Sequence, residues 1–109
     1  MDSTVTANIV EIVVTCPSPE SASELAELLI QERLAACAQS IQQVMSIYRW
    51  EGRVENEPEA RLAIHTSARL VEEVRAAVDQ FHPYDLPCFL VFDVRTSPGY
   101  AAWVAEEVK

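Results

Sequence analysis

The sequence predicts an α+β fold of the ferredoxin-like type, with the element order βαββαβ and one further helix at the C-terminus. Two observations predict it. Four segments rich in apolar and β-branched residues occur, and stretches with helical periodicity follow the first and the third of them. The two middle strands follow one another directly through Glu51-Gly52, a pair that favours a tight turn, so they form a long hairpin. This order is typical of a sandwich whose helices cover one face of an antiparallel sheet. At 109 residues, the chain is expected to form a single domain over 1–109.

The first strand and the first helix are marked by clear local signals. Asn8 to Thr15 is a short β-branched run, typical of a strand that is covered on both faces. Ser18 followed by Pro19 is a favourable helix cap and first-turn pair. Apolar residues then recur at helical spacing, which predicts an amphipathic helix from Pro19 to about Ala35.

The hairpin is predicted from two long segments on either side of the turn. Cys37 to Glu51 is the second strand, with an irregularity expected at Gln42-Gln43, and Arg53 to Thr66 is the third. Asn56-Glu57-Pro58 is expected to interrupt the third strand. Proline cannot donate a ladder hydrogen bond, so this part is an edge or a bulge.

The second half repeats the pattern of helix and strand. Ser67 is expected to cap a helix that ends at His82-Pro83, because the residue before a proline avoids helical angles. Cys88 to Arg95 is the fourth strand and is apolar on both faces. Ser97-Pro98 then predicts a last helix from Gly99 to about Val108.

Composition excludes several classes of function. The chain has 17 acidic and 8 basic side chains, a net charge of -9, which disfavours nucleic acid as a partner. Its apolar runs are too short to cross a membrane, and Met1 to Thr4 lacks the features of a signal peptide. The three cysteines form no C-x-x-C pair, so free thiols and a cytoplasmic location are expected. Only two glycines occur, which excludes a glycine-rich phosphate loop.

The apolar faces predict association with further copies of the chain. Strands one and four are apolar on both faces, although the helices of this fold cover only one face of the sheet. Tyr48 and Trp50 lie two apart near the hairpin tip and share a face that also needs cover. A homo-oligomer with ligand clefts between subunits is therefore expected.

Four motifs together resemble the CutA family of divalent-cation tolerance proteins over roughly residues 8 to 107. The resemblance implies a ferredoxin-like homotrimer, similar in architecture to PII-type signalling proteins, whose long hairpin reaches a neighbouring subunit. It also implies a link to copper and other divalent metals. The chain departs from the family pattern at Gln42-Gln43, His65 and Cys88. The motifs are Glu32-Arg33-Leu34-Ala35-Ala36-Cys37, Ser46-Ile47-Tyr48-Arg49-Trp50-Glu51-Gly52, His82-Pro83-Tyr84-Asp85-Leu86-Pro87 and Tyr100-Ala101-Ala102-Trp103.

Cys16, His82 and Cys88 form a candidate metal site. In this topology all three lie at the same end of neighbouring strands, and thiolate and imidazole ligands suit copper or zinc. The alternative is structural: a cysteine is often a small buried hydrophobe, and His82 could simply bond the last helix carbonyls. For Cys37, which follows Ala35-Ala36, packing is the favoured interpretation. No cofactor is required, and copper or another divalent cation is the expected ion.

A second set of residues could line a ligand cleft or a trimer interface. The hairpin contributes Tyr48, Arg49, Trp50 and Glu51, where the arginine offers a planar fork to a carboxylate or phosphate. The simpler alternative is that the aromatics anchor the trimer and that the two charged residues form an ion pair. The rest of the set is His65, Tyr84 and Asp85. The alternative for His65 is a simple surface histidine, and the alternative for Asp85 is a turn residue.

These features favour a trimeric, PII-like regulatory or metal-responsive binding protein that is not an enzyme. A small hydrolase of the same fold remains an alternative, but such chemistry needs an arginine-bearing loop after strand one, where this chain has Cys16-Pro17-Ser18-Pro19. A cysteine nucleophile, Cys16 or Cys88, paired with His82 is conceivable, without an evident third group to orient the histidine. A purely structural trimeric hub is the third alternative.

Overall fold

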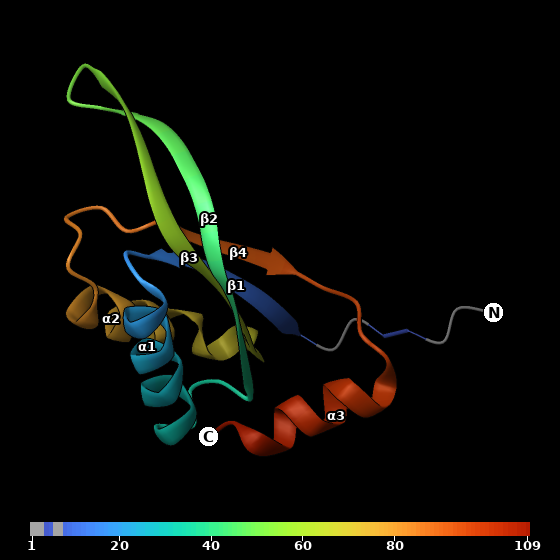
Figure 1. The fold of residues 1–109 in the computed structure, drawn as a ribbon. Helices are drawn as coiled ribbons and strands as arrows, with labels where there is room; N and C mark the ends of the chain where they lie inside the picture. The colour runs from blue at the N-terminus through green and yellow to red at the C-terminus, as the bar shows by residue number, and fades with distance from the viewer. Residues whose placement is uncertain (1–3, 6–7) are drawn as a thin grey trace.

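The computed structural model describes residues 4–5 and 8–109 and confirms the ferredoxin-like α+β fold (Figure 1). Residues 1–3 lie outside the described residues. They belong to the N-terminal stretch that is expected to lack the features of a signal peptide. The elements are β1 (Ile9–Cys16), α1 (Pro19–Gln31), β2 (Cys37–Trp50), β3 (Arg53–Ser67), α2 (Val71–Phe81), β4 (Phe89–Asp93) and α3 (Pro98–Glu107).

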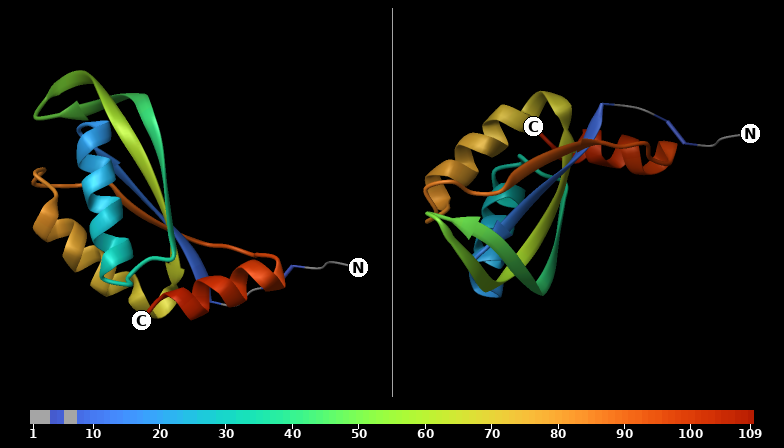
Figure 2. Two further views of the ribbon diagram at one scale, coloured as in Figure 1. Left: turned by 60° about the horizontal axis from the view of Figure 1, so that its bottom comes forward. Right: turned by 90° about the horizontal axis from the view of Figure 1, so that it is seen from above.

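The four strands form one sheet in the order β2-β3-β1-β4, and every neighbouring pair is antiparallel. Helices α1 and α2 lie side by side on one face, where the main core forms between them and β1 and β3 (Figure 2). Helix α3 packs on the lower end of the sheet through a smaller cluster of Ile9, Ala101 and Val104. Within the described residues, therefore, only the lower end of the second sheet face is covered.

Helix α1 ends at Gln31, which is four residues earlier than the sequence predicts. Arg33 adopts a left-handed conformation, with φ of 58°, that stops the helix. The N–H of Leu34 donates to the Leu29 carbonyl at 2.9 Å and the N–H of Arg33 donates to the Ile30 carbonyl at 3.1 Å. This is the Schellman ending, with arginine where glycine is usual. The sequence offered no glycine or proline there to reveal it.

The hairpin agrees with the sequence prediction in outline and differs in two details. The register shifts between Ile41 and Val44, which confirms the irregularity at Gln42-Gln43. Strand β3 runs on without interruption, because β1 pairs with it only as far as Ala60 and Pro58 lies on a free edge beyond that point. Glu51 lies in the turn and not in β2: it and Gly52 have φ of 50° and 79°, as a tight hairpin turn requires.

Two predicted boundaries in the second half are also corrected. Ser67 is the last residue of β3 and makes no side-chain capping bond, because a 3₁₀ turn over Ala68–Leu70 precedes α2. Strand β4 covers only Phe89–Asp93, since it pairs with β1 from Val10 to Val14 and has no other neighbour.

Helix α3 is capped at its start and is fixed to the subunit at its end. At its start, the Ser97 hydroxyl accepts the N–H of Tyr100. At its end, the Arg33 guanidinium donates to the carbonyls of Glu106 and Glu107 at 3.1 and 3.0 Å, and the N–H of Lys109 donates to the Arg33 carbonyl. These bonds satisfy carbonyls that a helix end leaves without partners, so α3 is held as part of the domain.

Candidate functional site

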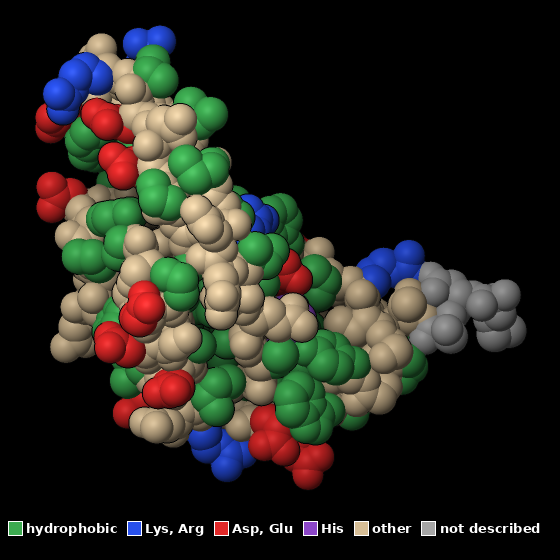
Figure 3. Space-filling model, viewed as in Figure 1, with side chains coloured by type: hydrophobic (Ala, Val, Ile, Leu, Met, Phe, Trp, Pro, Cys, Tyr) green, Lys and Arg blue, Asp and Glu red, His purple; other side chains and the backbone are tan. Residues whose placement is uncertain are grey.

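The hairpin carries exposed apolar side chains on both of its faces. Figure 3 shows apolar side chains along the hairpin from one side. Tyr48 and Trp50, the aromatic pair noted in the sequence, are 42% and 41% exposed. Met45, Ile47 and Val54 belong to the opposite face and are more exposed still, at 56%, 69% and 64%. The sequence interpretation missed these aliphatic residues, although Met45 and Ile47 alternate with the aromatics along β2. An exposed patch of this kind marks an interaction surface.

The aromatic face of the hairpin meets the segment after α2 at a tyrosine-carboxylate cluster. The Tyr84 hydroxyl donates to Glu59 Oε2 at 3.3 Å. Burial, and after it the charge and hydrogen bond of Glu59, raise the pKa of Tyr84 to about 12, with smaller effects from Tyr48 and Glu57. Partial burial and the carboxylates of Glu57, Glu55 and Glu59 likewise raise the pKa of Tyr48. Two of the predicted cleft residues, Tyr48 and Tyr84, thus lie beside one acidic stripe within a single subunit.

The remaining predicted cleft residues are distributed differently. Arg49 pairs with Val54, on the aliphatic side of the hairpin, and Glu51 forms the turn. Asp85 is exposed in the bend between α2 and β4. His65 lies apart from these residues, because it pairs with Glu11 near the lower end of β1. Six residues of β3, about 20 Å at ~3.3 Å per residue, separate it from Glu59.

His82 does not join the predicted metal cluster, because both of its ring nitrogens are already engaged. Its Nδ1 accepts the backbone N–H of Tyr84 at 3.2 Å, which requires the proton to be on Nε2. Nε2 then donates to the carbonyl of Thr15 at 2.7 Å. The buried ring connects the end of α2 to the end of β1, so His82 has a structural role, as the alternative interpretation expected.

The two cysteines of that cluster also differ in character. Cys16 is buried, and burial followed by the charge of Glu59 raises the pKa of its thiol to about 11, which keeps it protonated. Cys88 is exposed in the loop before β4. Across residues 4–5 and 8–109, no group of three or more His, Cys, Asp or Glu side chains is placed to hold a metal ion. The prediction of a metal centre at Cys16, His82 and Cys88 is therefore corrected, and so is the pairing of either cysteine with His82.

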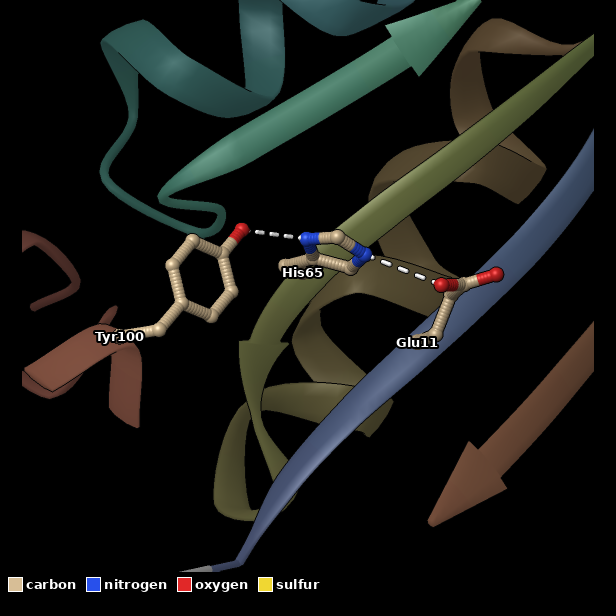
Figure 4. Close-up of polar contacts among 3 residues, drawn as sticks. All are labelled: Glu11, His65 and Tyr100. Atoms are coloured by element: carbon tan, nitrogen blue, oxygen red, sulfur yellow. Dashed lines mark hydrogen bonds and ion pairs between the residues drawn. The ribbon is translucent and has the colours of Figure 1, made fainter. Parts of the chain in front are cut away.

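A second polar cluster, which the sequence analysis missed, lies on the sheet face that carries α3 (Figure 4). His65 Nε2 lies 3.0 Å from Glu11 Oε2, and His65 Nδ1 lies 2.5 Å from the Tyr100 hydroxyl. The tyrosine ring meets the imidazole edge-on, with the ring planes at 88°. One signal was available: Glu11 is the only charged residue in the apolar strand Ile9–Cys16, and such a charge requires a partner.

This cluster predicts a measurable effect of alkaline pH. Burial, and then Cys37 and Glu11, raise the pKa of Tyr100 to about 12 from its usual value of 10. The folded state thus retains a proton that the unfolded state loses. The contribution of the Tyr100 hydroxyl to the free energy of unfolding is therefore full below pH 10 and disappears as the pH rises towards 12. In urea unfolding, Tyr100→Phe is expected to lose less stability than the unsubstituted chain between pH 9 and 12, since phenylalanine cannot ionise. An equal loss of stability in both proteins would contradict this prediction.

None of the helices formed by the described residues is both long and apolar enough to cross a membrane.

Comparison with known proteins gives one consistent answer. A family model described as CutA1 divalent ion tolerance protein matches residues 10–107. The chain is 34% identical over 99 residues to the divalent-cation tolerance protein CutA of Pyrococcus horikoshii, covering 90% of this chain and 96% of that protein. It is 37% identical over 92 residues to Protein CutA of Mus musculus, covering 84% of this chain but 52% of that protein, so it spans about half the length of the mouse relative.

The fold agrees equally well with a solved structure. The structure titled periplasmic divalent cation tolerance protein CutA, from Archaeoglobus fulgidus, superposes with a TM-score of 0.90 at 30% identity, covering 93% of this chain and 99% of that chain. The predicted fold class, the shared motifs and a family match that spans almost the whole domain all agree. The chain belongs to the CutA1 divalent ion tolerance family.

Proposed function

We propose that the protein acts as a homotrimer that binds a divalent cation or a small ligand in clefts between subunits, in the manner of a PII-like regulator. The observation that carries the proposal is the apolar surface on both faces of the hairpin and on β4, where Leu90 and Phe92 are also exposed. A single subunit gains nothing by holding these side chains in water. Burial against sister subunits would remove a large apolar area at about 25 cal/mol per Å².

The tyrosine-carboxylate cluster is the proposed binding surface. Tyr48, Glu57, Glu59 and Tyr84 lie together on the aromatic face of the hairpin, which a neighbouring subunit would close. The predicted residues Trp50, Glu51 and Asp85 would form its rim, whereas Arg49 projects from the aliphatic face of the hairpin. Carboxylate oxygens suit divalent cations, and the names of the relatives refer to tolerance of such ions. Copper is proposed as the first ion to examine.

Titration of Cu²⁺ and Zn²⁺ against the assembled protein tests this proposal. Trp50→Ala is expected to weaken both assembly and ion binding, because buried aromatics contribute most to interfaces and the cleft needs a neighbour to close it. Glu57→Gln is expected to weaken ion binding alone. Cys88→Ser, an exposed position outside the cleft, is the control and should bind normally. Ion binding that is equal in all four proteins would reject the cleft, and no binding at all would favour the purely structural hub.

We also propose that the protein is cytoplasmic, because all three of its cysteines are free thiols. The periplasmic title of the Archaeoglobus relative makes this a point to check by fractionation of cells that express the chain.

A further inference from the structure

A cleft of about 410 Å³ lies between α1 and α2, in the helical layer of the subunit. Its lining comes from α1, the loop that follows α1, α2 and Lys109. The two helices lie on the opposite side of the sheet from the face that the proposed trimer would cover (Figure 2). Sites for small molecules commonly have volumes of roughly 300–1,000 Å³. The cleft therefore has the volume for a small ligand, at a place separate from the hairpin.

The interior of the cleft is apolar and is kept open by small side chains. Helix α2 contributes Ala76 and Ala77, where longer side chains would fill the space between the helices. Helix α1 contributes Leu28, and the buried Leu34 follows in the loop after it. Phe81, at the end of α2, is half-buried and adds an aromatic ring. The hydrocarbon part of a ligand would be removed from water against these side chains.

Three charged side chains border the cleft, and two of them already form an ion pair. Lys109 Nζ lies 3.1 Å from Glu73 Oε1. Glu32 is the third, exposed at the C-cap of α1. Within the described part of the chain, its carboxylate has no ion-pair or hydrogen-bond partner. Because the charges of Glu73 and Lys109 compensate each other, the cleft carries one net negative charge.

The end of α1 adds to the preference for a positively charged ligand. The C-terminal end of a helix is the negative end of its dipole, and cations stabilise it. Helix α1 has no basic residue in its last turn. The guanidinium of Arg33, the next residue after Glu32, is engaged by carbonyls at the end of α3. The net charge of -9 attracts cations to the whole molecule as well.

We propose that the cleft between α1 and α2 binds a small organic ammonium ion with an apolar body, of the class of aliphatic and aromatic monoamines. The Glu32 carboxylate accepts hydrogen bonds from the ammonium group. Leu28, Leu34 and Phe81 cover the hydrocarbon. A neutral molecule of the same shape lacks the charged contact, and an anion is repelled by Glu32. The site lies within one subunit and is distinct from the proposed ion site on the hairpin.

An NMR titration of the full chain with 2-phenylethylamine tests the proposal. 2-Phenylethanol and 3-phenylpropionate keep the ring and change the charge. The amine should shift the amide signals of Ala77 and Gln80, which line the cleft, and should bind about five-fold more tightly than the alcohol, as expected for a partly exposed ion pair. The propionate should bind more weakly than the alcohol. Equal affinity for amine and alcohol, or shifts that leave the cleft unaffected, would overturn the proposal.

Glu32→Gln tests the charged contact, because glutamine keeps the size of the side chain and removes its charge. It should weaken binding of the amine about five-fold and leave binding of the alcohol unchanged. Glu24→Gln is the matched control, since Glu24 is exposed on α1 outside the cleft and the same charge is lost. Equal weakening in both variants would show only a general attraction to the acidic surface and would reject the site.

Ala76→Leu tests the cleft itself. Ala76 is exposed, so a longer side chain costs the fold little, yet it would occupy the space between the helices. Binding of both the amine and the alcohol should fall by more than about ten-fold, whereas Ala102→Leu, at an exposed position of α3, should bind normally. Unchanged binding in Ala76→Leu would reject the cleft. Trp50→Ala and Glu57→Gln should retain amine binding, so this proposal and the hairpin site fail separately.

Discussion

Ile47→Asp is expected to separate the proposed trimer into folded monomers. The side chain is 69% exposed in the subunit, so an aspartate there costs the isolated fold little. In the assembly the same position would be buried, where a carboxylate without a partner is strongly unfavourable. A loss of more than about 2 kcal/mol per interface is expected, as at other interface hot spots. Light scattering after size exclusion measures the mass, and circular dichroism verifies the fold.

Ser23→Asp is the matched control for this experiment. Ser23 is exposed on α1, outside the hairpin, and the substitution adds the same charge. It should leave the trimer intact. A trimer that survives Ile47→Asp, or one that Ser23→Asp disrupts equally, would show that the hairpin is not the interface.

His82→Ala is expected to destabilise the subunit without changing its uptake of copper. The substitution removes the donor to the Thr15 carbonyl and the acceptor for the Tyr84 N–H, and it leaves a cavity where a buried ring was. Two lost hydrogen bonds and the cavity together suggest a loss of about 2–4 kcal/mol in the free energy of unfolding. Urea unfolding measures the stability, and equilibrium dialysis against Cu²⁺ measures the uptake.

Cys88→Ser is the control for His82→Ala and should alter neither quantity, because the side chain is exposed. Normal stability combined with lost copper uptake in His82→Ala would restore the metal role and refute the structural one.

The sequence predicted those features that local chemistry determines. Ser18 and Pro19 began a helix where expected, and the Ser18 side chain caps it together with Ser21. The tight turn at Glu51-Gly52 and the irregularity at Gln42-Gln43 were located correctly for the same reason. Turn and cap signals involve residues that are close in the chain, so one sequence suffices to identify them.

Features that depend on distant contacts were not predictable in the same way. Arg33 ends α1 in a conformation that arginine seldom adopts, and its side chain bonds the end of α3, more than seventy residues away. His82 and Cys16 do lie at the same end of the sheet, as the topology indicated. Only the three-dimensional structure reveals that a backbone carbonyl and a backbone N–H already bond both nitrogens of the imidazole.

His65 illustrates the same limit more fully. Its partners come from β1, β2 and α3, and strand register decides which residues meet. A shift of one residue would have turned the side chain to the other sheet face. The sequence placed His65 in the third strand but could not identify Glu11 and Tyr100 as its neighbours.

The mass of the unsubstituted protein in solution is the most direct measurement of the central claim, that apolar surfaces on the hairpin and β4 are covered by sister subunits. At micromolar concentration, multi-angle light scattering should give about three times the chain mass of 12.2 kDa. A stable species of 12.2 kDa would contradict the account.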